Sequence, residues 1–215
     1  VVRAPKDRPN DDYESEDDDY TEKNLTELKQ MIKPMPASFI PKDGNFESFP
    51  ELHATTVKRM KEKGYVNLFP IQQHASTQLL AEDIIARDLT GSGKTLGYAL
   101  PIVEYLRKEK LLGSRKVQAI VMAPTRELAI QVTKVFSELK HTPNEYSCIT
   151  VYGGVSIEDK FVNLQSVEFF VGTTGRIIDH IERGNIDFSN IKTIVLDEAD
   201  QMLKLGFKED IEHIL

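Results

Sequence analysis

The sequence contains one cysteine, no tryptophan and no apolar run long enough to span a membrane. A single cysteine excludes an internal disulfide framework, which is typical of proteins in a reducing compartment. The N-terminal residues show no signal-peptide pattern, so we expect neither secretion nor attachment to a membrane. Cys148 lies in the apolar run 148–151, and we interpret it as a core residue rather than as a nucleophile.

The sequence also has no excess of basic over acidic residues. The formal net charge is −7, whereas nucleic-acid-binding proteins usually carry a basic surface. Residues 1–43 contain seven Lys/Arg and eleven Asp/Glu, a net of −4, which leaves −3 for residues 44–215. The body of the chain is therefore near neutral, and a basic groove on one face remains compatible with its composition. Composition alone does not identify the partner.

Residues 1–43 are predicted to be an acidic, disordered tail followed by a linker that contains prolines. Within the segment 11–19, only Tyr13 and Ser15 are not acidic, and like charges with nothing apolar to bury favour disorder. The tail is either a solvated segment or an electrostatic mimic of nucleic acid that lies across the domain's own binding groove. The chain begins with Val1 and stops at Leu215 inside an amphipathic pattern, which we interpret as a piece of a longer protein.

A glycine-rich segment has the context of a phosphate-binding loop, namely Thr90-Gly91-Ser92-Gly93-Lys94-Thr95. It follows the apolar run 83–86 and precedes an apolar, helix-like segment from 96 to 106. Glycines let successive N–H groups point at phosphate oxygens, and the start of the following helix adds partial positive charge. Lys94 would contact the β- and γ-phosphates, and the Thr95 hydroxyl would hold Mg²⁺. The general pattern has glycine at the position of Asp88, whose carboxylate we expect to point away from the phosphates.

Buried-type apolar runs alternate with helical patterns along the rest of the chain. We expect strands at 83–86, 118–123, 149–152, 168–171 and 192–196, and helices at about 54–63, 72–80, 96–106 and after 126 to about 140. This alternation predicts an α/β fold with a mostly parallel sheet and helices on both faces. Ligands bind beyond the carboxyl ends of such strands, so the polar clusters that follow the strands should line one edge of the sheet.

The last of these clusters is Asp197-Glu198-Ala199-Asp200. A carboxylate at a strand end downstream of a phosphate loop commonly holds Mg²⁺, and a neighbouring carboxylate can orient or deprotonate water. Upstream, Gln72 begins a predicted helix, and its amide can both donate and accept, as reading the edge of an adenine requires. From spacing alone, Gln72 would more often be an ordinary surface residue of that helix.

From about Phe46 to Leu215 these segments together resemble the DEAD-box RNA helicases. Residues 197–200 spell the name motif of that family, and Gln72 ends a segment similar to its adenine-reading Q motif, here spanning 46–72. The segment 124–129 (Pro-Thr-Arg-Glu-Leu-Ala) is similar to its first RNA-contacting motif, and Gly153-Gly154 to its glycine pair. The resemblance implies the first (N-terminal) RecA-like P-loop domain of two that close around ATP and single-stranded RNA. The spellings at 46–50 and 68–72 look most similar to the nucleolar Gu-type subgroup.

The resemblance also implies a role for individual residues. Gln72 would read the adenine edge and Phe46 would stack on the base, with Phe49 as the alternative, while residues 90–95 would hold the phosphates. Asp197 and Thr95 would hold Mg²⁺, Glu198 would activate the attacking water together with Asp197 and Lys94, and Asp200 would couple the nucleotide site to the next motif. The RNA backbone would meet Pro124, Thr125, Arg126, Gly153, Gly154, Thr174, Gly175 and Arg176. Such contacts carry no base sequence, so recognition of single-stranded or locally duplex RNA should be sequence-independent.

Two departures from the family pattern affect the expected activity. Thr174 stands where the family usually has proline, which frees φ and adds an N–H donor at a helix start. The Ser-Ala-Thr motif and the second RecA-like domain with its arginine fingers lie outside the 215 residues. Because an arginine finger is worth about 10³–10⁵ in turnover, we expect this chain to bind adenine nucleotide weakly and to hydrolyse it hardly at all.

The leading interpretation is thus an RNA-dependent ATPase that uses ATP and Mg²⁺, acts as a monomer and works in the nucleus or nucleolus, or otherwise in the cytoplasm. A nucleotide-gated RNA clamp or adaptor with little turnover is the alternative, motivated by Asp88 and Thr174. A small-molecule kinase on the same phosphate-loop fold explains neither Gln72 nor the segment 124–129.

Overall fold

Four parallel strands form the centre of the protein. The computed structural model describes residues 44–79, 83–89, 91–154 and 166–214. Its strands are β1 (Ala119–Ala123), β2 (Cys148–Val151), β3 (Phe169–Thr173) and β4 (Thr193–Leu196). They lie in the order β2-β3-β1-β4, and each neighbouring pair is parallel, with Ala119 opposite both Phe169 and Thr193. The predicted strands at 118–123, 149–152, 168–171 and 192–196 are confirmed to within two residues.

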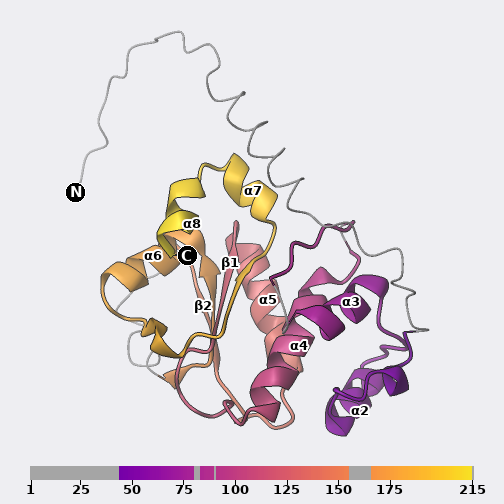
Figure 1. The fold of residues 1–215 in the computed structure, drawn as a ribbon. Coiled ribbons are helices and arrows are strands. Elements are labelled where there is room, and N and C mark those ends of the chain that lie inside the picture. Colours follow the sequence, from indigo (N-terminus) through magenta and orange to yellow (C-terminus); the bar gives the residue numbers. More distant parts are fainter. Residues whose placement is uncertain (1–43, 80–82, 90, 155–165, 215) are drawn as a thin grey trace, which may run out of the picture. The chain divides into compact units, whose positions relative to one another are not determined.

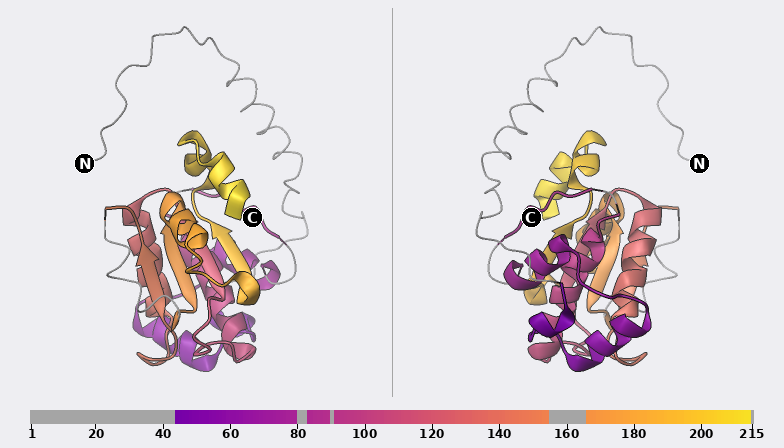
Figure 2. Two further views of the ribbon diagram at one scale, coloured as in Figure 1. Left: turned by 90° about the vertical axis from the view of Figure 1, so that its left-hand side faces the viewer. Right: turned by 90° about the vertical axis from the view of Figure 1, so that its right-hand side faces the viewer.

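Side chains that alternate along the strands divide the core into two halves, one on each face of the sheet. Val121 and Phe169 belong to one apolar cluster, and Ile120 and Phe170 to the other. The first cluster lies against α4 (Lys94–Lys108) and α5 (Arg126–Glu138), and the second against α6 (Thr174–Glu182) and α8 (Lys208–Ile214). Figure 1 shows these two pairs of helices on opposite sides of the strands, and Figure 2 gives the side views. The predicted α/β architecture, with helices on both faces of a parallel sheet, is confirmed.

The segment before the phosphate loop packs beside α4. A short 3₁₀ turn (Phe46–Ser48) leads into α2 (Ala54–Glu62), and α3 (Pro70–Gln78) follows with proline in its first turn, where no N–H is needed. Lys63 caps the C-terminus of α2, and Gly64 follows with a φ of +87°, which suits glycine after a helix. At the other end of the chain, α7 (Ala199–Lys204) begins inside the acidic cluster. Among the described residues, no helix is long and apolar enough to cross a membrane.

The expected strand at 83–86 is not formed. Residues 83–89 carry neither helix nor strand, and Ile85 and Leu89 are 53% and 81% exposed. Among the described residues the sheet consists of β1 to β4 alone, so the apolar run 83–86 lies outside the ladder of backbone hydrogen bonds. Cys148, by contrast, packs against the core, and burial raises the pKa of its thiol to about 12, which fits a structural cysteine. The predicted tail, residues 1–43, lies outside the described residues.

Candidate functional site: a phosphate loop and a polar strand edge

The polar segments singled out from the sequence converge because the strands are parallel. β1 is followed by residues 124–126, β2 by 152–154, β3 by 174–176 and β4 by 197–198. All four strands therefore present these segments at the same edge of the sheet. The N-terminus of α4, which carries Lys94 and Thr95, reaches this edge as well, because Tyr98 in its first turns contacts Asp197 at the end of β4. The site thus collects residues that are about 100 positions apart in the chain.

The phosphate loop is held by backbone geometry that only glycine adopts without strain. Gly91 and Gly93 have φ of +83° and +81°, and Gly93 is the residue from which α4 starts. The Lys94 ammonium donates to the backbone oxygens of Asp88 and Leu89, both at 2.8 Å. The Asp88 carboxylate is exposed and accepts from the Leu89 N–H at 2.8 Å, so it engages the backbone rather than Lys94. Thr90 lies outside the described residues.

Gln72 connects the start of α3 to this loop. Its side chain is 3% exposed; its Oε1 accepts from the Phe69 N–H at 2.9 Å and its Nε2 donates to the Gly93 carbonyl at 3.1 Å. These bonds use one of the amide's two N–H groups and one of its two lone pairs. A Cβ at position 93 would collide with the same Nε2. Gln72 is therefore placed against the phosphate loop, and its predicted contact with adenine stays a prediction.

The aromatic residue beside the loop differs from the two that the sequence analysis named. Phe46 and Phe49 are each 1% exposed and belong to the apolar core, so both rings are covered in the structure. Their predicted stacking on a base stays a prediction, since the sequence pattern gives the order of aromatic residues but not which of them is covered. Phe69 is 55% exposed, and its Cδ2 lies 3.4 Å from the position that a Cβ of Gly93 would occupy. Phe69 is the exposed ring next to Gln72 and the loop.

Asp197 is buried at the end of β4. Its backbone N–H donates to the Met122 carbonyl at 2.9 Å, and its Oδ2 accepts from the Tyr98 hydroxyl at 2.8 Å. The carboxylate belongs to a residue that is only 7% exposed, and burial raises its pKa above the ordinary value. The bonds from Tyr98 and the Glu198 backbone, together with the charge of Lys94, act in the opposite direction. Lys94 and Asp197 are therefore close enough to interact electrostatically.

Glu198 has a backbone conformation that is uncommon for its type. Its φ of +53° and ψ of +46° place it in the left-handed region, at the residue that precedes α7. Such conformations cost free energy and are concentrated at functional sites. Glu198 is partly buried, whereas Asp200 is exposed and forms an ion pair with Lys204 at 3.8 Å. Asp200 therefore has no contact with the phosphate loop among the interactions of the described residues.

The donor set at this edge suits a small, hard cation. The Thr95 hydroxyl and the Asp197 carboxylate are oxygen ligands of the kind that Mg²⁺ prefers, and the Tyr98 hydroxyl donates to the Asp197 carboxylate. Within the described part of the chain, no three His, Cys, Asp or Glu residues cluster as a complete metal cage. One or two protein ligands combined with nucleotide phosphates is the usual arrangement for Mg²⁺. The residues present therefore fit a nucleotide-borne Mg²⁺ ion.

Beyond the loop, two arginines meet at Tyr152. The Arg126 guanidinium carbon lies 4.3 Å from the centre of the Tyr152 ring, a cation–π geometry. Arg176 donates to the Tyr152 carbonyl at 3.2 Å and pairs with Asp179 at 3.4 Å. Gly153 and Gly154 follow directly and are exposed. Residues from the ends of β1, β2 and β3 thereby form one surface that carries two positive charges, as contact with a phosphate backbone requires.

Two of the predicted RNA-contacting residues do not belong to that surface. Pro124 is buried at the end of β1, and Thr174 is 1% exposed. The Thr174 hydroxyl donates to the Met202 sulfur at 3.3 Å, which connects the start of α6 to α7. These two side chains are covered in the structure, and their predicted contact with RNA stays a prediction. Thr125, Arg126, Gly153, Gly154, Gly175 and Arg176 are on the surface or partly exposed. Thr174 is buried because the first turn of α6 faces the core.

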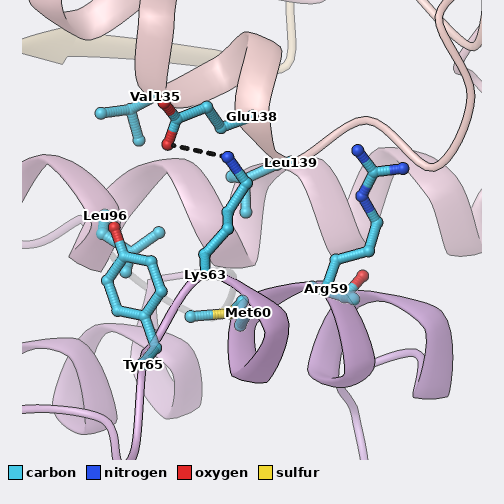
Figure 3. Close-up of a pocket in the computed structure, with 9 residues that line it drawn as sticks. Arg59, Met60, Lys63, Tyr65, Leu96, Val135, Glu138 and Leu139 are labelled. Carbon is cyan, nitrogen blue, oxygen red and sulfur yellow. Dashed lines mark ion pairs between the residues drawn. The ribbon is translucent and has the colours of Figure 1, made fainter.

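A small pocket in the described part of the chain lies elsewhere, between α2, α4 and α5. Figure 3 shows Lys63 crossing it to pair with Glu138, at 3.4 Å, with Tyr65 and Arg59 on its rim. None of the predicted site residues lines this pocket. The candidate site therefore lies apart from this pocket.

Three residues of the site were missed by sequence reasoning: Phe69, Tyr98 and Tyr152. Tyr98 follows Thr95 by three positions, so the two share one face of α4, and this spacing was the available signal. Tyr152 directly precedes the glycine pair, and Phe69 directly precedes the proline that starts α3. Each looked like an ordinary apolar residue, since local sequence does not show which ring reaches a polar neighbour.

Comparisons with known proteins agree with this architecture. The sequence model of the DEAD/DEAH box helicase family matches residues 69–215. The chain is 40% identical over 178 residues to "ATP-dependent RNA helicase DDX50" from Homo sapiens, covering 81% of this chain. It is 41% identical over 179 residues to "Nucleolar RNA helicase 2" from Rattus norvegicus, again covering 81% of this chain. The crystal structure of a DEAD box protein from the hyperthermophile Methanococcus jannaschii superposes with a TM-score of 0.70 at 36% identity, covering 79% of this chain.

The matches cover only part of the known proteins. The chain spans 24% of the human relative, 22% of the rat relative and 46% of the M. jannaschii chain. The structural match nevertheless confirms the predicted RecA-like fold for the part that is present.

Proposed function

This chain belongs to the DEAD/DEAH box helicase family, and from this membership we propose that it is the ATP-binding half of an RNA helicase, which binds ATP–Mg²⁺ and single-stranded RNA. One observation carries the proposal: a phosphate loop, a buried aspartate and a surface with two arginines share one edge of a parallel sheet. A nucleotide and an RNA backbone can then be bound by neighbouring strand ends. Binding of nucleotide can then bias the conformation of the RNA-binding surface, and binding of RNA that of the nucleotide site.

In the proposed nucleotide site, the loop N–H groups and Lys94 bind the phosphates. Lys94 exchanges its two backbone carbonyl partners for phosphate oxygens, which are stronger acceptors because they are charged. Thr95 and Asp197 hold Mg²⁺, which when bound neutralises charge on the β- and γ-phosphates. Glu198 orients the water that attacks the γ-phosphorus and accepts its proton. Gln72 and the exposed ring of Phe69 contact the adenine.

In the proposed RNA site, Arg126 and Arg176 contact the phosphate backbone. Both guanidinium groups are fixed by Tyr152, so little side-chain entropy is lost when RNA binds. The exposed glycines 153, 154 and 175 allow close approach of the backbone of RNA. Because none of these groups reads base edges, binding is independent of RNA sequence.

Hydrolysis and unwinding are proposed to need a second RecA-like domain that supplies arginine fingers. Without such a group, turnover falls by about 10³–10⁵, so the 215 residues alone bind ATP weakly and turn it over hardly at all. The protein works as a monomer. Because relatives such as "Nucleolar RNA helicase 2" carry a nucleolar name, a nucleolar location is proposed for this chain as well. Asp200, which faces solvent, is proposed to contact the following motif.

The test is ATP turnover by a chain extended to include a second domain, with and without single-stranded RNA. Strong stimulation by RNA that Glu198→Gln abolishes would establish the helicase motor and put Glu198 at the chemistry. ATP-dependent RNA binding without turnover would instead favour the nucleotide-gated clamp, and Asp88 and Thr174 would be the first positions to revert. The absence of any nucleotide binding, with Lys94→Ala indistinguishable from the parent, would refute both.

A further inference from the structure

Tyr98 contacts one of the two residues proposed to hold Mg²⁺. Its hydroxyl donates to Asp197 Oδ2 at 2.8 Å, across 99 positions of sequence. Thr95, the other proposed ligand, lies three residues earlier in α4, on the same face of the helix. The phenol oxygen of Tyr98 therefore joins α4 to the end of β4.

Packing of the Tyr98 ring restricts the position of the hydroxyl oxygen. The Tyr98 ring packs against Phe136, with ring centres 6.4 Å apart, and Phe136 is completely buried on α5. A two-torsion aromatic side chain held in a packed core has little rotational freedom. The Tyr98 hydroxyl is therefore held in one position.

The orientation of the Asp197 carboxylate depends on this hydroxyl. Its backbone is held by the bond to the Met122 carbonyl, so the remaining freedom of the side chain is rotation of the carboxylate. The bond from Tyr98 to Oδ2 fixes this rotation and leaves Oδ1 to be directed elsewhere. Partners that orient a metal ligand in this way typically change metal affinity by about 10–100-fold when they are removed.

We propose that Tyr98 is a positioning residue that presets the Asp197 carboxylate for Mg²⁺ before nucleotide binds. This inference rests on the proposed function, since it takes Thr95 and Asp197 as the Mg²⁺ ligands. It adds a residue that contacts neither the nucleotide nor the metal and acts through the Asp197 carboxylate alone. The consequence is specific: loss of the hydroxyl should weaken Mg²⁺-dependent binding without altering nucleotide binding in the absence of the metal.

The experiment measures binding of a fluorescent ADP derivative to the 215-residue chain while Mg²⁺ is titrated, with a parallel series in EDTA. Tyr98→Phe keeps the ring and removes only the hydroxyl. The Mg²⁺ concentration for half-maximal binding should rise about tenfold, while binding in EDTA is unchanged. Tyr105→Phe, on the same helix, is the control and should behave as the parent. An unchanged Mg²⁺ dependence in Tyr98→Phe would overturn the inference.

Two further comparisons separate the possible failures. If the parent chain binds no ADP even at high Mg²⁺, the proposed function falls and the role of Tyr98 falls with it. If the parent binds but Tyr98→Phe shifts nothing, only the role of Tyr98 falls. In a double-mutant cycle, Tyr98→Phe should have almost no further effect on Mg²⁺ dependence in the Asp197→Asn background, because it acts through that carboxylate. An effect of equal size in both backgrounds would contradict the inference.

Discussion

Replacing Arg107 by methionine should severely destabilise the domain, although Arg107 lies far from the strand edge. Its guanidinium donates to Glu104, to both carboxylate oxygens of Glu145 at 2.8 and 3.2 Å, to Thr56 at 3.2 Å and to the Leu139 carbonyl at 3.1 Å. All five N–H groups are therefore used. The side chains of Arg107 and Glu104 are 13% and 8% exposed, so water cannot replace the lost partner.

The expected loss in the free energy of unfolding follows from the carboxylates that methionine cannot pair. Glu104 and Glu145 would remain buried without their shared cation, and removing one partner of a buried ion pair typically costs about 3–5 kcal/mol. Folded domains are stable by about 5–15 kcal/mol, so this loss is a large fraction of the total. Arg107→Lys keeps the charge but offers three donors in place of five, and should cost about 1.5–3 kcal/mol.

The assay is urea unfolding followed by circular dichroism, with the free energy of unfolding extrapolated to water. Lys108→Met, at the next and exposed position of α4, is the matched control and should change stability by less than about 0.5 kcal/mol. A loss below about 1 kcal/mol in Arg107→Met would refute the reasoning. It would mean that the two carboxylates find other partners or take up protons at little cost.

Two other perturbations have clear expected outcomes. In Gly172→Ala, the new Cβ would lie 2.6 Å from the Val151 carbonyl oxygen inside the sheet. The free energy of unfolding, measured in the same urea assay, should therefore fall by about 1–3 kcal/mol. Gly153→Ala is the control and should be nearly neutral, because a Cβ at position 153 has open space around it. Burial, and then the nearby Arg107 charge, lower the pKa of His141 below its unfolded value of about 6.5. The folded state therefore binds a proton at His141 less readily than the unfolded state does. The stability that neutral His141 contributes is fully present above the unfolded-state pKa, and it should be lost as the pH falls from there through the lowered folded-state pKa. Unfolding measured from pH 7.5 to 5.5 should show this slope, and His141→Gln should flatten it; an identical slope in the variant would contradict the assignment.

Local patterns determined much of this protein from the sequence alone. The alternation of apolar runs and helical segments predicted a parallel sheet covered on both faces, and four strands were placed within two residues of their observed bounds. Strand ends in such a sheet converge by geometry, so the meeting at one edge of the polar segments that follow β1 to β4 was also predictable. Motif spacing identified the family, and the sequence comparison confirmed it.

The tertiary structure decided what each side chain does at that edge. Phe46 and Phe69 are the same residue type in one motif, yet the first is 1% and the second 55% exposed. The apolar run 83–86 has strand-like composition, but a strand forms only where the fold brings the run against a hydrogen-bonding neighbour, and in the described residues this run pairs with no strand. Thr174 looked like a surface residue and is buried against Met202.

The same division explains Tyr98. Its position in α4 follows from local periodicity, which places it on the face of Thr95. Its bond to Asp197 joins segments 99 positions apart, and no local pattern encodes which of several tyrosines will reach a carboxylate across that distance. Sequence determines the elements and their order because those depend on neighbours along the chain. The pairing of buried polar groups depends on neighbours in space, and only the folded chain brings them together.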